Sequence, residues 1–241
     1  GVAAATADPP VEWGDAKSVA WKAAVPGRGR SSPVVLGDRV FLTTAVERGV
    51  VRKRIGADDM QTAEHVDLGA VCRACADGKI LWQVTLRAVD KPEPVHWLNS
   101  WATPTPVAEA NRVWCDFGAF GTWSLDAETG KTVWEKRLPI HHMVGPGSSP
   151  VLAGDRLILV RDGCDTQYVT ALDKATGAEA WKTPRPPIKP PNDSMKKSFS
   201  TPLLIQSGGR TQLVSTGPHW GVSYDPATGK ELWRAHHGMG F

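Results

Sequence analysis

The stretch Leu172–Trp181, LDKATGAEAW, decides the fold because it recurs through the chain. Close copies are LDAETGKTVW at Leu125–Trp134 and YDPATGKELW at Tyr224–Trp233, and a worn copy, ACADGKILW, ends at Trp82. Asp and Thr side chains hydrogen-bond backbone amides in tight turns, and Gly supplies the positive φ that such turns need. An acid that recurs in every copy has a structural role, since one active site needs only one copy. We therefore interpret the motif as a hairpin turn followed by a packing Trp.

A second marker precedes each repeat Trp. It consists of Ser or Thr, then Pro, an apolar run, a polar turn with Arg and a second apolar run, as in SSPVLAGDRLILVRDG from Ser148. The repeat Trp residues lie about 50 residues apart. The positions assigned a structural role in the repeat are Gly78, Trp82, Asp126, Gly130, Trp134, Asp173, Gly177, Trp181, Asp225, Gly229 and Trp233.

Each repeat unit is predicted to form four short strands. In the third unit these are roughly 150–153, 156–161, 167–173 and 178–183, separated by turns that contain Gly. No stretch has sustained helical periodicity. Four-stranded units with this period are typical of a β-propeller. The sequence therefore predicts an all-β fold, a propeller of four-stranded antiparallel blades with about four blades present.

The repeats resemble those of pyrroloquinoline-quinone (PQQ)-like propellers, a superfamily that includes quinoprotein alcohol dehydrogenases and the outer-membrane assembly lipoprotein propeller. The resemblance covers nearly the whole chain after residue 10. The stretches PGRGRSSPVVLGDRVFLTTA, NSWATPTPV and GPGSSPV resemble more narrowly an exported bacterial group of largely undefined activity. The resemblance implies a ring of eight blades, with the repeat Trp packed between neighbouring blades.

We expect the propeller domain to span 8–241 as an incomplete arc of such a ring, and a closed ring of four blades is the alternative. The expected parts are a closing strand at about 18–25 that carries Trp21, and blades at about 31–86, 102–138, 148–183 and 199–236. Residues 1–7 contain Ala5-Thr6-Ala7, which fits a signal-peptide cleavage site. This remnant predicts a periplasmic or secreted protein of the bacterial cell envelope, and an unstructured Ala-rich terminus is the alternative.

Composition argues against two classes of partner. The 28 basic residues are nearly balanced by 25 acidic ones, and the short basic run at Arg52–Arg54 is predicted to lie in a solvated loop. We therefore predict no nucleic-acid binding. No apolar run approaches the roughly 20 residues of a membrane-spanning helix, so no transmembrane span is predicted.

The cysteines do not identify a metal or redox site. Cys72 and Cys75 form a C-x-x-C without a second pair or a His pair at zinc spacing, which favours a structural role. The sequence leaves open whether these two, Cys115 or Cys164 form disulfides. Catalytic members of the family use two adjacent Cys residues and a calcium ion, and the chain has no Cys-Cys dipeptide. PQQ and calcium are thus implied by the resemblance alone, and no catalytic or metal residue is assigned.

Ligand-binding candidates come from segments that do not repeat, because propellers bind ligands near the central channel or on the loops of one face. Imidazoles, amides and indoles gather in two linkers and in the fourth unit. The candidates are His96, Asn99, Ser100, Trp101, His141, His142, His219 and Trp220. Inter-blade packing is the alternative role for each Trp, and a backbone hydrogen bond is the alternative for each His. At Asp162–Asp165, DGCD, a hairpin turn is favoured over a calcium site.

The leading functional hypothesis is a non-catalytic propeller that acts as a binding or scaffolding module, with a protein partner or a small ligand on one face. The alternative is a PQQ-dependent oxidoreductase completed by missing blades, in which His96, Asn99 and His142 line the channel. A third reading is carbohydrate binding through the Trp residues outside the repeat, namely Trp97, Trp101, Trp123 and Trp220. The insertion at 46–64 is predicted to be a charged loop, and 183–197 a stiff extended connector.

Overall fold

The structure is a computed structural model that describes residues 6, 8–14 and 16–238. Apart from Thr6, the expected cleavage signal lies outside the described residues. Within them, regular structure consists of β-strands and two short 3-10 helices, η1 (Gly118–Phe120) and η2 (Asp193–Lys196). The prediction of an all-β fold is confirmed.

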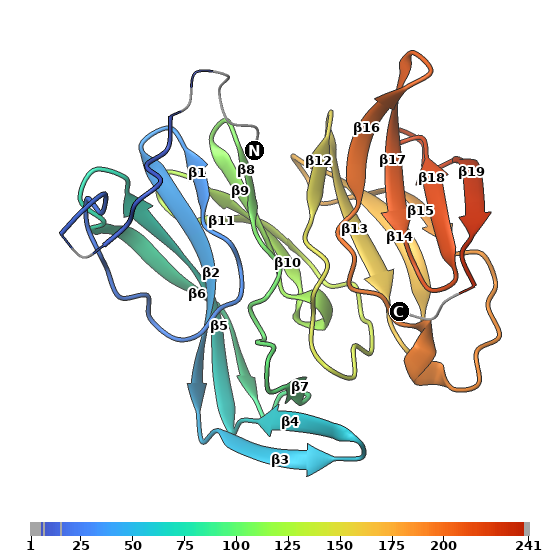
Figure 1. Ribbon diagram of the computed structural model, residues 1–241, viewed down its shortest axis with the longest axis horizontal. Helices are drawn as coiled ribbons and strands as arrows, with labels where there is room; N and C mark the ends of the chain where they lie inside the picture. The colour runs from blue at the N-terminus through green and yellow to red at the C-terminus, as the bar shows by residue number, and fades with distance from the viewer. Residues whose placement is uncertain (1–5, 7, 15, 239–241) are drawn as a thin grey trace.

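Four antiparallel sheets of four strands follow one another along the chain (Figure 1). Each sheet is a meander in which consecutive strands of the unit pair side by side. Blade 1 contains β1 (Val34–Leu36), β2 (Arg39–Arg48), β5 (His65–Ala74) and β6 (Ile80–Asp90). Blade 2 contains β8 (Val107–Glu109), β9 (Arg112–Asp116), β10 (Thr122–Asp126) and β11 (Thr132–Lys136). Blade 3 contains β12 (Val151–Ala153), β13 (Arg156–Asp162), β14 (Gln167–Asp173) and β15 (Glu179–Pro184), and blade 4 contains β16 (Leu203–Ser207), β17 (Arg210–Thr216), β18 (Trp220–Tyr224) and β19 (Glu231–His236).

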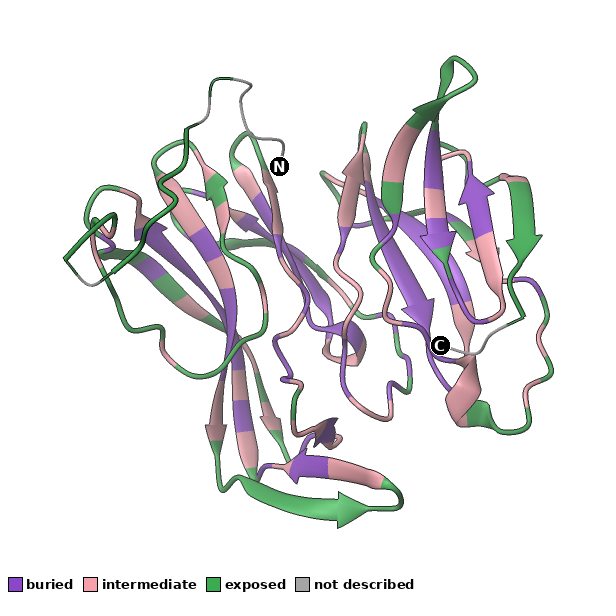
Figure 2. Cartoon of the chain, in the orientation of Figure 1, coloured by how far each residue is buried: buried purple, intermediate pink, exposed green. Residues whose placement is uncertain are grey.

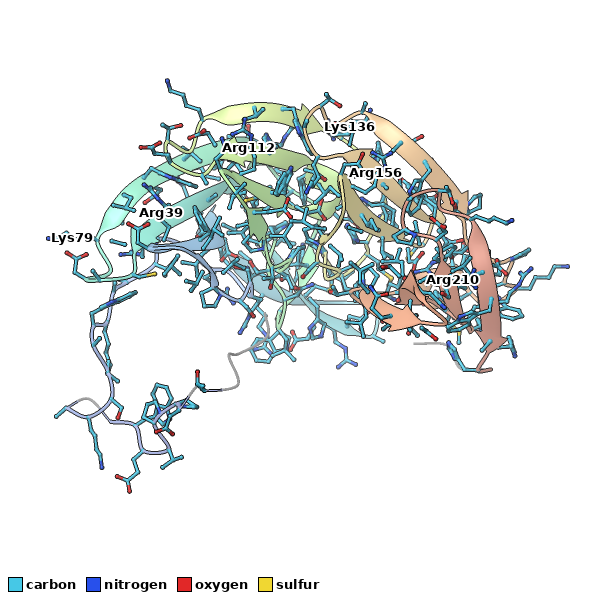
Figure 3. The ribbon with its side chains drawn as sticks, turned by 90° about the horizontal axis from the view of Figure 1, so that it is seen from above. Arg39, Lys79, Arg112, Lys136, Arg156 and Arg210 are labelled. Carbon is cyan, nitrogen blue, oxygen red and sulfur yellow. The ribbon has the colours of Figure 1, made fainter. Side chains whose placement is uncertain are left out.

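Seen from above, the four blades fan out along an arc (Figure 3). Buried side chains concentrate in the middle strands of each blade (Figure 2). One apolar cluster joins blades 1 and 2, a second joins blades 2 and 3, and a third joins blades 3 and 4. The core therefore lies between neighbouring blades, which is how a propeller buries sheets that each have two apolar faces.

The turn of the opening motif is held by its own side chains. One carboxylate oxygen of Asp173 accepts hydrogen bonds from the amides of Ala175 and Thr176 and from the Thr176 hydroxyl, at 2.8–3.1 Å. These bonds lower the pKa of Asp173. Gly177 then adopts a φ of +74°, a left-handed conformation that Gly takes without steric cost. Asp126 and Asp225 accept bonds from amides of their own turns in the same way.

In blades 1 to 3 the Trp after the turn docks on the Gly of the next blade. A Cβ added to Gly177 would lie 2.8 Å from the Trp134 ring, so only Gly allows the indole to approach so closely. The Trp134 indole N–H donates to the Lys174 carbonyl in the same turn, at 3.0 Å. The other pairs with this geometry are Trp21 with Gly78, Trp82 with Gly130, and Trp181 with Gly229.

The two ends of the arc show how far this docking extends. Residues 18–25, where a closing strand was expected, have no strand pairing, although Trp21 docks on blade 1. Trp233 of blade 4 is 41% exposed and donates to Gln212 in its own blade at 2.8 Å. In the described chain the docked Trp therefore joins the segment before blade 1 to that blade, and each blade to the next.

The Ser/Thr-Pro marker connects the segments that lead into the first strands of neighbouring blades, β1, β8, β12 and β16, which we call the inner strands. The Ser32 amide donates to the Thr105 hydroxyl at 3.0 Å, and the Thr105 amide donates to the Ser149 hydroxyl at 2.9 Å. The Ser149 amide continues the series to the Thr201 hydroxyl at 3.0 Å. Each hydroxyl precedes a Pro, which has no amide to donate. The marker thus builds a hydrogen-bonded chain across the start of the four inner strands.

The insertion in blade 1 is a sheet rather than a loop, so that prediction is wrong. Residues 46–64 contain the end of β2 and the hairpin of β3 (Val51–Ile55) and β4 (Asp58–Thr62), which turns at Gly56 with φ +62°. The two-residue strand β7 (Val95–His96) pairs with β4 and completes a three-stranded sheet. In the 183–197 connector, η2 interrupts the extended chain that was expected.

Candidate functional site

The linkers before blades 2 and 3 lie against each other. The His96 amide donates to the Val144 carbonyl at 3.0 Å, and the Asn99 side-chain amide donates to the Val144 and Pro146 carbonyls at 2.9 and 3.1 Å. Gly145, with φ +94°, allows this contact because a Cβ there would lie 2.7 Å from Val95. The fold therefore brings together two linkers whose residues are about 45 positions apart in the sequence.

Asn99 and Ser100 hold this junction and have little capacity left for a ligand. The Asn99 carbonyl oxygen accepts bonds from the Ser100 amide at 2.8 Å and from the Thr103 hydroxyl, so both ends of the side chain are used. The Ser100 hydroxyl donates to the Arg28 carbonyl at 3.3 Å and accepts from the Ala102 amide at 3.1 Å.

His96 lies at the rim of a pocket of about 350 Å³ on this linker face. Its Nδ1 accepts a bond from the Leu98 amide at 3.2 Å, which places the proton of the neutral ring on Nε2. The rest of the wall is mostly apolar and comes from both linkers and from the start of blade 4. The other lining residues are Leu98, Asn99, Thr103, Val144, Pro146, Gly147 and Phe199.

His141 and His142 are adjacent but occupy different environments. His141 is exposed, and its Nδ1 lies 2.7 Å from the Glu93 carboxylate. It lines a second pocket, of about 440 Å³, with Met143, Cys164 and Asp165. His142 is buried, and burial lowers its pKa to about 3, with nearby Arg161 acting in the same direction. Its Nε2 packs against Gly118 without a hydrogen-bond partner, so His142 is a neutral packing residue.

His219 and Trp220 lie apart from the linker junction, at the turn from β17 to β18. The His219 ring stacks on His236 with centroids 6.1 Å apart, and Trp220 meets the same imidazole edge-on at 4.7 Å. The eight candidates therefore do not form one site. Four come from the linker before blade 2, two from the linker before blade 3, and two belong to blade 4.

Two of the four Trp residues outside the repeat are buried, and the other two are half-buried beside an Arg. Trp101 and Trp123 are 0% and 1% exposed in the core between blades 1 and 2. The guanidinium of Arg52 lies 3.8 Å from the ring centroid of Trp97, and that of Arg234 lies 5.5 Å from Trp220. Trp101 and Trp123 therefore offer no free face for stacking on a sugar.

Sequence reasoning missed two buried ion pairs, one between blades 2 and 3 and one at the end of blade 3 whose Arg also contacts blade 4. Arg161 of blade 3 contacts Asp116 of blade 2 at 2.6 Å, and Thr122 donates to the same carboxylate at 2.6 Å. Arg185, after β15, contacts Asp162 at 2.8 Å and donates to the hydroxyl of Ser215 in blade 4 at 2.7 Å. Asp162 thus serves an inter-blade contact and not a cation site. The only signal in the sequence was a charged residue at the end of an otherwise apolar strand.

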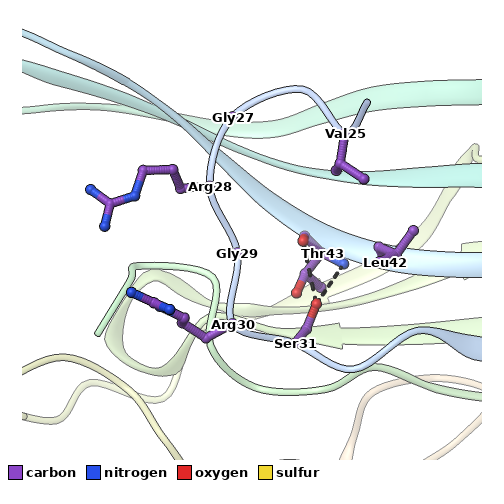
Figure 4. Close-up of a pocket in the computed structure, with 8 residues that line it drawn as sticks. All are labelled: Val25, Gly27, Arg28, Gly29, Arg30, Ser31, Leu42 and Thr43. Carbon is purple, nitrogen blue, oxygen red and sulfur yellow. Dashed lines mark hydrogen bonds between the residues drawn. The ribbon is translucent and has the colours of Figure 1, made fainter. Parts of the chain in front are cut away.

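A further pocket, of about 350 Å³, lies beside the loop Gly27–Ser31 (Figure 4). Ser31 ties the loop to the backbone of Thr43, and Figure 4 shows Arg28 and Arg30 extending from one side of the loop. Arg28 donates to Gln61 at 2.8 Å. The pocket is therefore a gap beside an anchored connection between the N-terminal segment and blade 1.

The pocket wall around His96 does not suit PQQ with calcium. A quinone with three carboxylates needs cationic or amide donors, and calcium needs carboxylate oxygens. The wall around His96 contains no Lys, Arg, Asp or Glu, and its Asn99 amide is already bonded. Across residues 6, 8–14 and 16–238, no group of three His, Cys, Asp or Glu is arranged to hold a metal ion. Cys72, Cys75, Cys115 and Cys164 are free thiols.

No helix in the described part of the chain is long and apolar enough to cross a membrane.

Comparison with solved structures identifies propellers. The quinohemoprotein alcohol dehydrogenase ADHIIG of Pseudomonas putida HK5 matches with a TM-score of 0.55 at 14% identity, over 90% of this chain and 35% of that one. The quinohemoprotein alcohol dehydrogenase of Comamonas testosteroni matches with a TM-score of 0.52 at 15% identity, over 84% and 38%. BamB of Moraxella catarrhalis matches with a TM-score of 0.47 at 16% identity, over 86% and 76%. The chain thus spans well under half the length of both dehydrogenases. A comparison with curated proteins found no match.

The sequence itself matches a family model over residues 67–240, which covers three of the four blades completely and half of blade 1. The description of that model is outer membrane protein assembly factor BamB. This match agrees with the docked repeat Trp and with the core between blades. The chain belongs to the BamB-type family of PQQ-like β-propellers.

Proposed function

We propose that this chain is a non-catalytic propeller that serves as a binding or scaffolding module in the cell envelope. The observation that carries the proposal is that polar side chains among the ligand-binding candidates are already bonded or packed within the protein. Asn99 and Ser100 have their side chains bonded within the linker junction, and His142 is neutral and packed against Gly118. These groups stabilise the arrangement of the blades instead of facing a substrate.

The family description supports the same role, since it names an assembly factor of the outer membrane. A periplasmic or secreted location and a protein partner follow from that likeness as proposals. The same holds for the ring of eight blades, of which these four would form half. Fold likeness to dehydrogenases does not by itself imply their chemistry.

The second candidate is a PQQ-dependent oxidoreductase, favoured by the structural likeness to two quinohemoprotein dehydrogenases. In that case His96, Asn99 and His142 would line the channel of a larger ring. The contacts that already engage Asn99 and His142 speak against such a role.

Equilibrium dialysis of the full-length protein against PQQ and calcium, followed by a dye-linked assay with alcohols and sugars, separates the two candidates. A binding module is expected to retain neither ligand at stoichiometric level and to reduce no dye. Stoichiometric uptake of PQQ together with substrate-dependent dye reduction would replace the proposal by the oxidoreductase.

A further inference from the structure

Strand β3 presents a free edge. It pairs with β4 at all five of its positions, and no strand of the described chain pairs with its other edge. All five residues of β3 are exposed, and Figure 2 shows the strand at the far end of the inserted sheet, away from the blades. A strand with an open row of amides and carbonyls is a template for pairing with another chain.

The sheet that carries this edge is held by the N-terminal loop and by the linker before blade 2. Met60 and Gln61 of β4 are each 4% exposed, and Gln61 accepts the bond from Arg28. The Trp97 amide donates to the Asp59 carbonyl at 2.9 Å, and the Arg52 guanidinium lies over the Trp97 ring while it pairs with Asp59. A partner would therefore meet a strand that is already ordered, which lowers the entropic cost of binding.

The edge is basic with apolar flanks. The Arg52 side chain is paired with Asp59, whereas the side chains of Lys53 and Arg54 make no hydrogen bond or ion pair with the rest of the described chain. Side chains alternate along a strand, so Lys53 lies on the same face as Val51 and Ile55, which are 55% and 41% exposed. A partner strand that matches this edge would carry an acidic residue between two apolar ones on the face of Lys53. It would carry a second acidic residue opposite Arg54.

We propose that the free edge of β3 binds an extended acidic segment of a partner protein by strand addition. The inference names the partner chemistry for the binding role proposed above and rests on that role. A second copy of this chain does not fit the edge. Antiparallel pairing of two β3 strands would place Lys53 and Arg54 of one copy opposite cationic side chains of the other copy. Like charges directly opposite each other destabilise a strand pair. The main-chain ladder supplies affinity, and the charge pattern selects the partner.

The probe is a fluorescein-labelled peptide with the core sequence TVEEEVT, titrated with the full chain and followed by fluorescence anisotropy. Saturable binding is expected, with slower hydrogen exchange at the solvent-facing amides of residues 51–55. Lys53→Glu/Arg54→Glu is expected to weaken binding by at least about tenfold, since each change turns an attraction across the pair into a repulsion. The matched control, Lys131→Glu/Lys230→Glu, makes the same change in net charge at exposed turns of blades 2 and 4 and leaves binding unchanged.

Two N-methylated peptides distinguish strand addition from simple charge attraction. One carries N-methyl groups on the odd residues of the core and the other on the even residues, so each blocks one edge of the peptide. Strand addition predicts that one peptide loses binding and the other retains it. Equal binding by both, no saturation, or an equal effect of the control charge reversals would overturn the proposal. So would sedimentation that shows a dimer broken by Lys53→Glu/Arg54→Glu, because β3 would then pair with a second copy.

These results are independent of the PQQ assay. A failed peptide titration with no uptake of PQQ rejects the partner class and leaves the binding role in place. PQQ uptake with dye reduction rejects the binding role whatever the peptide does.

Discussion

Gly177→Ala tests whether the repeat Gly is required by the indole that docks on it or only by its backbone angle. Gly177 has a φ of +74°, and a Cβ there would lie 2.8 Å from Cδ2 and Cε3 of Trp134. Gly154 in the same blade has a φ of +58°, but its Cβ would meet no atom within 4 Å. The left-handed conformation costs a non-Gly residue about 1–2 kcal/mol at either position. Only Gly177→Ala adds the cost of overpacking, about 1–3 kcal/mol.

The free energy of unfolding is measured for both variants by urea denaturation followed by far-UV circular dichroism. We expect a loss of about 1–2 kcal/mol for Gly154→Ala and about 2–5 kcal/mol for Gly177→Ala. In a Trp134→Ala background the clash is gone, so Gly177→Ala should cost no more than Gly154→Ala. Equal losses for the two single variants would refute the docking argument, as would an undiminished effect of Gly177→Ala after removal of the indole.

Three further predictions concern the contacts between blades and linkers. Arg161→Met leaves the Asp116 carboxylate buried without its cation and should lower the free energy of unfolding by about 3–5 kcal/mol. Adding Asp116→Leu removes the unpaired carboxylate and should restore most of the lost free energy of unfolding in the same urea assay. If the double variant recovers no stability, the loss does not come from the unpaired Asp116. His142 has a pKa of about 3 in the folded protein against an ordinary value of 6.5, so the unfolded chain binds the proton first as the pH falls. Stability should therefore decrease below pH 6.5, by about 2 kcal/mol at pH 5 from this group. His142→Gln should remove that part of the pH dependence of unfolding, and an unchanged slope would rule out His142 as its source. Asn99→Ala leaves the buried Pro146 carbonyl unpaired, while the Val144 carbonyl keeps its bond from the His96 amide. The change should cost about 1–3 kcal/mol with faster hydrogen exchange at residues 142–147, whereas His96→Ala should leave exchange there unchanged. Similar exchange in both variants would show that Asn99 does not hold the junction.

The sequence predicted the blades well because a blade is a local structure. In blade 3 the expected strands at 150–153, 156–161, 167–173 and 178–183 differ from the observed ones by one residue at most at any end. The turn chemistry of Asp173 and Gly177 acts within a few residues, so the pattern contains all the information it needs. Repetition then removes the ambiguity of a single short motif.

The insertion in blade 1 was misread because charge hid its alternation. Val51, Lys53 and Ile55 share one face of β3, and Gly56 makes the turn, but consecutive cations at Arg52–Arg54 are usual for a solvated loop. Arg52 is stabilised by Asp59 and Trp97, and Trp97 lies about 45 residues further along the chain. No local pattern contains that contact.

The candidate site was located only in part, for a related reason. A linker rich in His, Asn and Trp indicates a region that differs from the repeat, and the linkers do meet around Asn99. Whether such a side chain faces a ligand or a neighbouring linker depends on the distance between blades, which the sequence does not contain. The same limit applies to the pair of Arg161 with Asp116, which joins two strand ends 45 residues apart.

The contacts that stabilise this propeller also determine where it can bind a partner. A side chain that already satisfies a buried carbonyl, as Asn99 does for Pro146, cannot be exchanged for a better ligand contact without leaving that carbonyl unpaired. The docked Trp134, the hydroxyl of Ser149 and the pair of Arg161 with Asp116 are under the same constraint. Unused hydrogen-bonding capacity lies instead on the edge of β3, where Lys53 can be replaced without exposing a buried group. Substitutions that change stability and substitutions that change binding should therefore fall on separate parts of the chain, the first between blades and the second on the inserted sheet.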